Sequence, residues 1–69
     1  MTIDAWLRAA AARLNHESAR LDAELLLTHL LGISRAALYA RLRDALADDI
    51  VASADALLAR RARGEPIAY

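Results

Sequence analysis

The chain has 69 residues, with nine arginines against nine acidic residues and with no lysine and no cysteine. A chain of this length forms one small domain that buries about 60% of its unfolded surface, which leaves no room for a large ligand cavity. The balanced charge argues against strong nonspecific binding to nucleic acid, and the lack of cysteine excludes disulfides and thiolate metal sites.

The first apolar residues recur at helical spacing. They occupy positions i, i+3, i+4, i+7 and i+11 and are Ile3, Trp6, Leu7, Ala10 and Leu14. This stripe predicts a first helix, and Thr2 stands where a side-chain N-cap is expected. The polar residues 15–17 then interrupt the pattern.

A second helix is predicted from Ser18, a candidate N-cap, to Leu31, with Gly32 suited to a left-handed helix end. Its leucines spread around most of the circumference and are Leu21, Leu25, Leu26, Leu27, Leu30 and Leu31. A helix that is apolar on several sides is expected to be central in the fold. Asp22 and His29 share a polar strip, which we expect to face water.

A short third helix is predicted after Ser34, whose side chain can cap it. Leu38 and Leu42 are its apolar residues. A looser connection then follows from Arg43 onward.

A fourth helix is predicted to begin at Asp48 or Asp49. Its apolar stripe comprises Ile50, Ala54, Leu57 and Leu58. The same stripe continues onto Arg61, so this charged residue is expected on the core side of the helix. Gly64 is placed to end the helix, and Pro66 favours the first turn of another.

These elements predict an all-α fold, a compact four- to five-helix bundle over residues 1–64, with 65–69 as a linker or the start of a further helix. Short connections favour packing between neighbouring helices. The predicted core comprises Trp6, Leu7, Leu25, Leu30, Leu31, Leu38, Leu57 and Leu58.

Three segments carry a family resemblance: Arg61-x-x-Gly64-Glu65-Pro66-Ile67-Ala68-Tyr69, the run Leu21 to Leu27, and Leu31-Gly32-Ile33-Ser34-Arg35. Over residues 3–69 the chain resembles the start of the PrmC/HemK family of release-factor glutamine methyltransferases. The resemblance implies a helical N-terminal domain ahead of an S-adenosylmethionine-dependent catalytic domain, which N5-methylates the glutamine of a Gly-Gly-Gln loop in peptide chain release factors.

The family's Asn-Pro-Pro-Tyr motif and its Gly-rich cofactor loop are both absent from the 69 residues. The resemblance therefore implies that the catalytic and cofactor-binding residues lie beyond Tyr69. Gly64, Glu65 and Pro66 are then expected to act as a hinge. The expected partners are the release factors and the protein's own C-terminal methyltransferase domain.

Arginines near the end of the fourth helix are the candidate site residues. A core-side Arg61 needs a carboxylate partner, and Glu24 is the first candidate and Asp22 the second. A structural ion pair is the expected role. Arg60 and Arg63 lie off the apolar stripe and are candidate contacts to the release factor.

A helix-turn-helix over residues 28–42 is an alternative interpretation, because a helix, a glycine turn and a short helix follow one another there. Arg35, Tyr39, Arg41 and Arg43 would then contact DNA. Zero net charge, the lack of lysine and the leucine-rich first helix argue against DNA as a partner.

Two further classes of function find less support in the sequence. His16 and His29, with Glu17 and Asp22 nearby, do not have a ligand spacing typical of a metal site, so no metal is expected. A purely structural or interaction bundle would need only the apolar stripes, and this interpretation stays open.

The start of the chain lacks the positively charged and apolar regions of a secretion signal. The uncharged run at residues 25–34 is about half as long as a membrane span. We therefore expect a cytoplasmic protein with no membrane partner.

Overall fold

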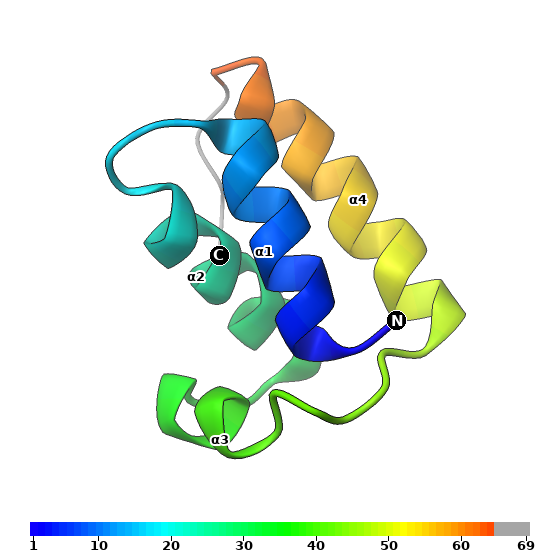
Figure 1. Ribbon diagram of the computed structural model, residues 1–69. Coiled ribbons are helices and arrows are strands. Elements are labelled where there is room, and N and C mark those ends of the chain that lie inside the picture. Colours follow the sequence, from blue (N-terminus) through cyan, green and yellow to red (C-terminus); the bar gives the residue numbers. More distant parts are fainter. Residues whose placement is uncertain (65–69) are drawn as a thin grey trace.

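The computed structural model describes residues 1–64. This part of the chain forms four helices, α1 (Ile3–Leu14), α2 (Ala19–Leu31), α3 (Arg35–Ala40) and α4 (Asp48–Ala62). Figure 1 shows α1 and α4 side by side, α2 running back along α1, and the short α3 crossing below them. The predicted all-α bundle is confirmed, while the candidate fifth helix at 66–69 falls outside the described residues.

Two of the three predicted side-chain caps make their hydrogen bond. The hydroxyl of Thr2 accepts from the backbone N–H of Ala5 at 3.1 Å, and that of Ser34 accepts from Ala37 at 3.1 Å. Such bonds satisfy N–H groups that the first turn of a helix leaves without a partner. Ser18 precedes α2 as predicted but makes no side-chain cap hydrogen bond.

Left-handed residues follow three of the helices. Asn15 ends α1 with φ 47°, and Gly32 ends α2 with φ 66°. Gly64, one residue beyond the C-cap of α4, has φ 90° and donates its N–H to the carbonyl of Arg61 at 2.9 Å. Glycine adopts such positive φ values at little cost, which explains its place at the end of α2 and after α4.

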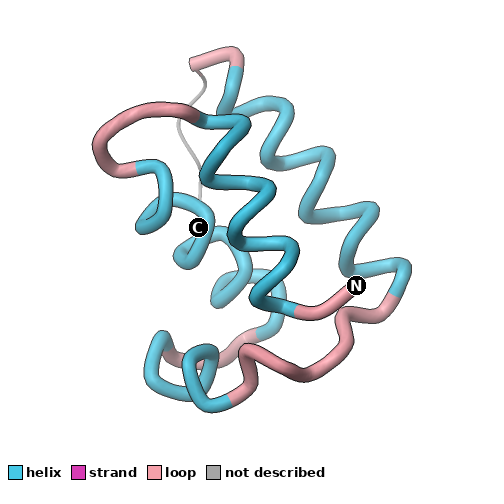
Figure 2. Tube along the Cα trace, in the orientation of Figure 1, coloured by secondary structure: helices cyan, strands magenta, loops and turns pink. Residues whose placement is uncertain are grey.

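The connection between α3 and α4 is tied to the start of α1. Ile3 donates to the carbonyl of Asp44 at 3.0 Å, and Asp4 donates to that of Leu42 at 2.9 Å. Figure 2 shows this connection passing below the N-terminal end of α1. Since the first N–H groups of a helix have no partner within it, these bonds satisfy the beginning of α1 through a distant segment.

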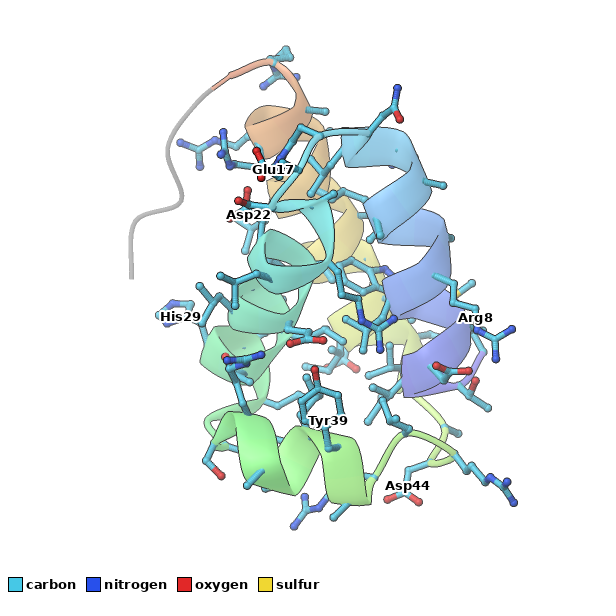
Figure 3. The ribbon with its side chains drawn as sticks, turned by 60° about the vertical axis from the view of Figure 1, so that its left-hand side comes forward. Arg8, Glu17, Asp22, His29, Tyr39 and Asp44 are labelled. Atoms are coloured by element: carbon cyan, nitrogen blue, oxygen red, sulfur yellow. The ribbon has the colours of Figure 1, made fainter. Side chains whose placement is uncertain are left out.

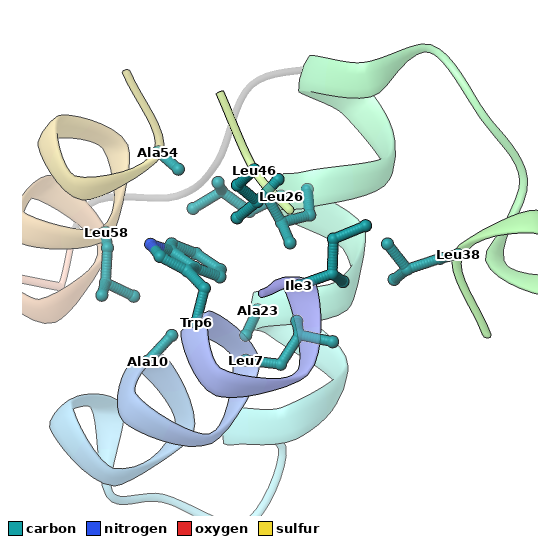
Figure 4. Packing of buried hydrophobic residues seen from close by; sticks show 11 residues of the cluster. Ile3, Trp6, Leu7, Ala10, Ala23, Leu26, Leu38, Leu46, Ala54 and Leu58 are labelled. Carbon is teal, nitrogen blue, oxygen red and sulfur yellow. The ribbon is translucent and has the colours of Figure 1, made fainter. Parts of the chain in front are cut away.

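The core contains residues from all four helices and from the α3–α4 connection (Figure 4). Its buried members are Ile3, Trp6, Leu7, Ala10, Ala23, Leu26, Leu27, Leu38, Leu46, Ala54 and Leu58. Trp6 is almost fully buried, and its indole Nε1 donates to Asp55 Oδ1 at 2.9 Å. The indole therefore joins α1 to α4 by packing and by a hydrogen bond.

Four of the predicted core residues are less buried than expected. Leu30, Leu31 and Leu57 pack against the edge of the core and stay partly exposed. Leu25 is also partly exposed, on the opposite side of α2 from Ala23. The prediction of full burial was wrong for the three leucines of α2 because the four helices do not enclose α2 on all sides, and Leu57 lies on α4 at the edge of the core.

Candidate functional site

A buried carboxylate lies where α2 meets α3. Among residues 1–64, Glu24 is the one charged side chain that is buried, with 1% of its surface exposed. It stands in the middle of α2, beside the core residue Ala23. A buried carboxylate must find hydrogen-bond donors, because losing water costs it several kcal/mol or so.

Three side chains supply those donors. Arg20, one turn earlier on α2, donates through Nε to Oε2 at 2.9 Å. Arg35 donates to Oε1 through Nε at 3.2 Å and Nη2 at 2.9 Å, and the Tyr39 hydroxyl donates to Oε2 at 2.6 Å. Because Arg35 and Tyr39 both belong to α3, the carboxylate fastens α3 to α2.

These contacts decide the charge of Glu24. Burial by itself would raise its pKa, but the hydrogen bonds from Tyr39, Arg20 and Arg35 and the charge of Arg35 outweigh burial and hold the pKa below 4.5. The hydrogen bond to Glu24 in turn raises the pKa of Arg35. The cluster therefore holds one negative and two positive charges at neutral pH.

The donors cover the carboxylate and are themselves about half exposed. The exposed fraction is 41% for the Arg20 side chain, 50% for the Arg35 side chain and 47% for Tyr39. In Figure 3 Tyr39 projects from α3 toward α2. We call Arg20, Arg35 and Tyr39, above the buried Glu24, the Tyr39 patch.

A second ion pair joins α2 to the end of α4. Arg61 contacts Asp22 Oδ2 through Nη2 at 3.0 Å and through Nε at 3.2 Å. His16 lies 3.3 Å from the same oxygen through Nε2, and its Nδ1 accepts from the N–H of Ser18 at 3.2 Å. Figure 3 shows Asp22 at the upper end of α2, near the end of α4.

The partner of Arg61 is therefore Asp22, the second of its two candidates, and Glu24 binds Arg20 and Arg35 instead. Asp22 is only partly exposed, so the expectation that it simply faces water was wrong, while His29 is exposed. Helix geometry places Asp22 and Glu24 on different sides of α2, and only the Asp22 side meets the last turn of α4.

The other predicted partner contacts lie at the C-terminal end of α4. Arg60 belongs to the last turn, and Arg63 is the C-cap; both are exposed. Gly64, the first residue of the predicted hinge, follows them. Glu65 and Pro66, its other members, lie outside the described residues.

The four candidate DNA-contacting residues are in two different settings. Arg35 and Tyr39 are held by Glu24. Arg41 follows α3 as its C-cap, and Arg43 stands in the α3–α4 connection; both are exposed. The helix that would read DNA has only six residues.

Over the described part of the chain, no group of three or more histidine, cysteine or acidic side chains could hold a metal ion. His16 and Asp22 are brought together, but the third side chain at this place is Arg61, which is not a metal ligand. In the same part of the chain, no helix combines the length and apolar character needed to cross a membrane.

Sequence reasoning overlooked the cluster around Glu24, although two spacings signalled it. Arg20 and Glu24 are four residues apart on α2, and Arg35 and Tyr39 are four apart on α3. Residues at this spacing share one helix face. The sequence alone does not tell that the two faces meet.

The chain matches the family model described as the PrmC N-terminal domain over residues 5–69. It is 46% identical over 65 residues to a release factor glutamine methyltransferase of Escherichia coli, with 93% of this chain and 24% of the relative covered. A protein of the same name from Geobacter sulfurreducens is 39% identical over 64 residues, with 93% of this chain and 22% of the relative covered. A third relative of this name, from Buchnera aphidicola, is 37% identical over 70 residues, with 100% of this chain and 26% of the relative covered.

The chain thus spans about a quarter of the length of these relatives. No solved structure matches it significantly. The family match covers α2, α3 and α4 completely and nearly all of α1. The chain belongs to the PrmC N-terminal domain family.

Proposed function

We propose that this domain binds a peptide chain release factor and positions it for a methyltransferase domain to which it is joined. The observation that carries the proposal is the match to the PrmC N-terminal domain, together with relatives named release factor glutamine methyltransferase. About three quarters of each relative lies outside the matched region. The proposal assigns the chemistry to that remainder.

The proposed reaction transfers a methyl group from S-adenosylmethionine to the side-chain amide nitrogen of a glutamine in a Gly-Gly-Gln loop. Both the cofactor and the glutamine would bind in the methyltransferase domain. Release factors act in translation, so the proposal puts the protein in the cytoplasm.

A docking domain has a physical reason to exist in such an enzyme. A release factor is far larger than a glutamine pocket, and contacts remote from the reacting atoms can be used to orient them. A helical domain in which Arg20, Arg35 and Arg61 are held by buried or partly buried carboxylates offers an ordered surface for such contacts. Loss of this surface should affect the protein substrate and leave the cofactor unaffected.

Methyl-transfer kinetics on the full-length enzyme test the proposal. Deleting residues 1–64 should lower kcat/KM on intact release factor by about a hundredfold, the scale of a lost positioning contact. A short peptide with the Gly-Gly-Gln sequence serves as the control, because it lacks the rest of the release factor, on which the proposed docking depends. Its kcat/KM and the affinity for S-adenosylmethionine, measured by calorimetry, should stay nearly unchanged.

If the truncated enzyme methylates intact release factor as efficiently as the whole enzyme, docking is wrong and the domain is an inert structural bundle. Equal losses on the protein and on the peptide would also contradict docking. They would mean that the deletion damages the catalytic domain.

A further inference from the structure

We infer that the Tyr39 patch is the surface with which this domain binds the release factor, and that it fits a partner surface carrying a carboxylate beside an apolar side chain. The inference rests on the proposed function and deepens it by naming the face that docks. It departs from the sequence-based expectation, which assigned the contact to Arg60 and Arg63 at the end of α4.

The composition of the patch is typical of the centre of a protein interface. Tyrosine and arginine are among the residue types most often found to dominate binding when interfaces are truncated side chain by side chain. Here Arg20, Arg35 and Tyr39 lie together, each about half exposed. Their half-exposed surface is available to a partner.

The patch is also rigid before any partner arrives. All three side chains are hydrogen-bonded to Glu24, which is itself buried in the fold. Arginine side chains normally lose conformational freedom when they enter an interface, and that loss weakens binding. The carboxylate has already fixed these side chains, so less freedom remains to be lost.

The charge of the patch selects an acidic partner. Two guanidinium groups share one carboxylate, which leaves one positive charge uncompensated within the cluster. Glu24 engages only Nε of Arg20, and of Arg35 only Nε and Nη2. The remaining amino groups can donate to a carboxylate of the partner, in a bond stronger than a neutral one.

An exposed leucine adds an apolar contact beside these charges. Leu21 is 41% exposed and precedes Glu24 by three residues, so the two are neighbours on α2. Leu25, four residues after Leu21 on the same face, is also partly exposed. A partner that presents an apolar side chain next to its carboxylate would cover this leucine face.

The same observations favour a protein partner over duplex DNA. DNA binding draws its affinity from many phosphate contacts, and the net charge of this chain is zero. Within the patch, half of the positive charge is already neutralised by Glu24. A single uncompensated charge next to an aromatic ring and a leucine suits a protein surface.

The test measures kcat/KM on intact release factor for variants of the full-length enzyme. Tyr39→Ala should lower it about tenfold or more, as removal of a central aromatic contact does. Tyr39→Phe keeps the ring and loses only the bond to Glu24, and should recover most of that loss. Arg20→Gln should lower kcat/KM about threefold, and the loss should shrink at high salt.

Arg13→Gln is the matched control, because it removes one exposed positive charge from the last turn of α1. Its kcat/KM should equal that of the parent enzyme. Thermal melting of each variant separates docking from folding. Arg20→Gln keeps the test decisive if Tyr39→Ala fails to fold.

Three outcomes would overturn the inference. If Tyr39→Phe loses as much as Tyr39→Ala, Tyr39 acts only by holding Glu24. If deletion of residues 1–64 is damaging but the patch variants are not, docking survives and occurs elsewhere, which the double variant Arg60→Glu, Arg63→Glu would reveal. If the domain binds duplex DNA in fluorescence anisotropy and Tyr39→Ala abolishes binding, the partner class is wrong.

Discussion

Glu24 shows how one buried residue can determine the placement of a whole helix. The α3 helix has six residues, too few to be stable by itself. It is held to α2 by Leu38 in the core and by Arg35 and Tyr39 on Glu24. An ionised carboxylate binds these donors more strongly than a neutral carboxyl group does, so the strength of the attachment depends on pH.

Replacing Glu24 by glutamine tests this dependence. The folded-state pKa of Glu24 lies below 4.5, its ordinary value. The stabilisation that the Glu24 charge gives to the fold is therefore fully present above pH 4.5 and is lost as the pH falls through the lowered pKa. At pH 7, Glu24→Gln should cost about 1 to 3 kcal/mol of unfolding free energy, with the half exposure of both arginines favouring the lower end.

Urea denaturation of both proteins between pH 7 and pH 3 gives the comparison. The difference in unfolding free energy should narrow below pH 4.5, because only the parent protein has a charge on Glu24 to lose there. A difference that stays constant across this range would show that the charge of Glu24 does not stabilise the fold.

The Asp22–Arg61 ion pair is the other contact that acts at the scale of single residues. Arg61→Ala should cost about 1 kcal/mol, more than an exposed arginine and less than a fully buried pair, because both partners are only partly buried. Arg13→Ala, at an exposed position, should cost less than about 0.5 kcal/mol. Equal losses in chemical denaturation would mean that the pair contributes nothing.

At the scale of elements, each helix depends on hydrogen-bond partners for the backbone groups at its ends. The first turn of α1 receives a cap from Thr2 and two backbone carbonyls from the α3–α4 connection. That connection therefore supports α1 as well as joining its own two helices. The α2 helix begins without a side-chain cap bond, although Ser18 stands in the usual place.

A series of serine and threonine substitutions tests the caps. Thr2→Ala and Ser34→Ala should each cost about 1 kcal/mol of unfolding free energy, since each removes a cap hydrogen bond. Ser18→Ala is the matched control and should cost only a few tenths of a kcal/mol or so, because its side chain makes no cap bond. A large loss for Ser18→Ala would show that the serine caps α2 in solution.

At the scale of the whole molecule, local patterns predicted the helices well. The structure has the helix ends that three local patterns predicted. These patterns are the stripe from Ile3 to Leu14, the glycine after Leu31 and the aspartates at the start of α4. These ends depend on nearby residues, so the sequence contains what is needed to predict them.

Contacts between helices were harder to predict. The partner of Arg61 depends on which side of α2 meets α4, and the cluster on Glu24 depends on where α3 crosses α2. Leu25 was expected in the core because α2 is apolar on several sides. The sequence of such a helix does not show which side the other helices leave exposed to solvent. Packing angles and helix order decide these cases, and no local pattern encodes them.

The central claim is that this domain contacts the release factor directly, and hydrogen–deuterium exchange on the full-length enzyme tests it most directly. Adding release factor should slow exchange of backbone amides in residues 20–24 and 35–40, because a partner on the Tyr39 patch stabilises both segments. The Tyr39→Ala variant should show less slowing at equal concentrations. Slowed exchange confined to the enzyme beyond residue 64 would contradict the account.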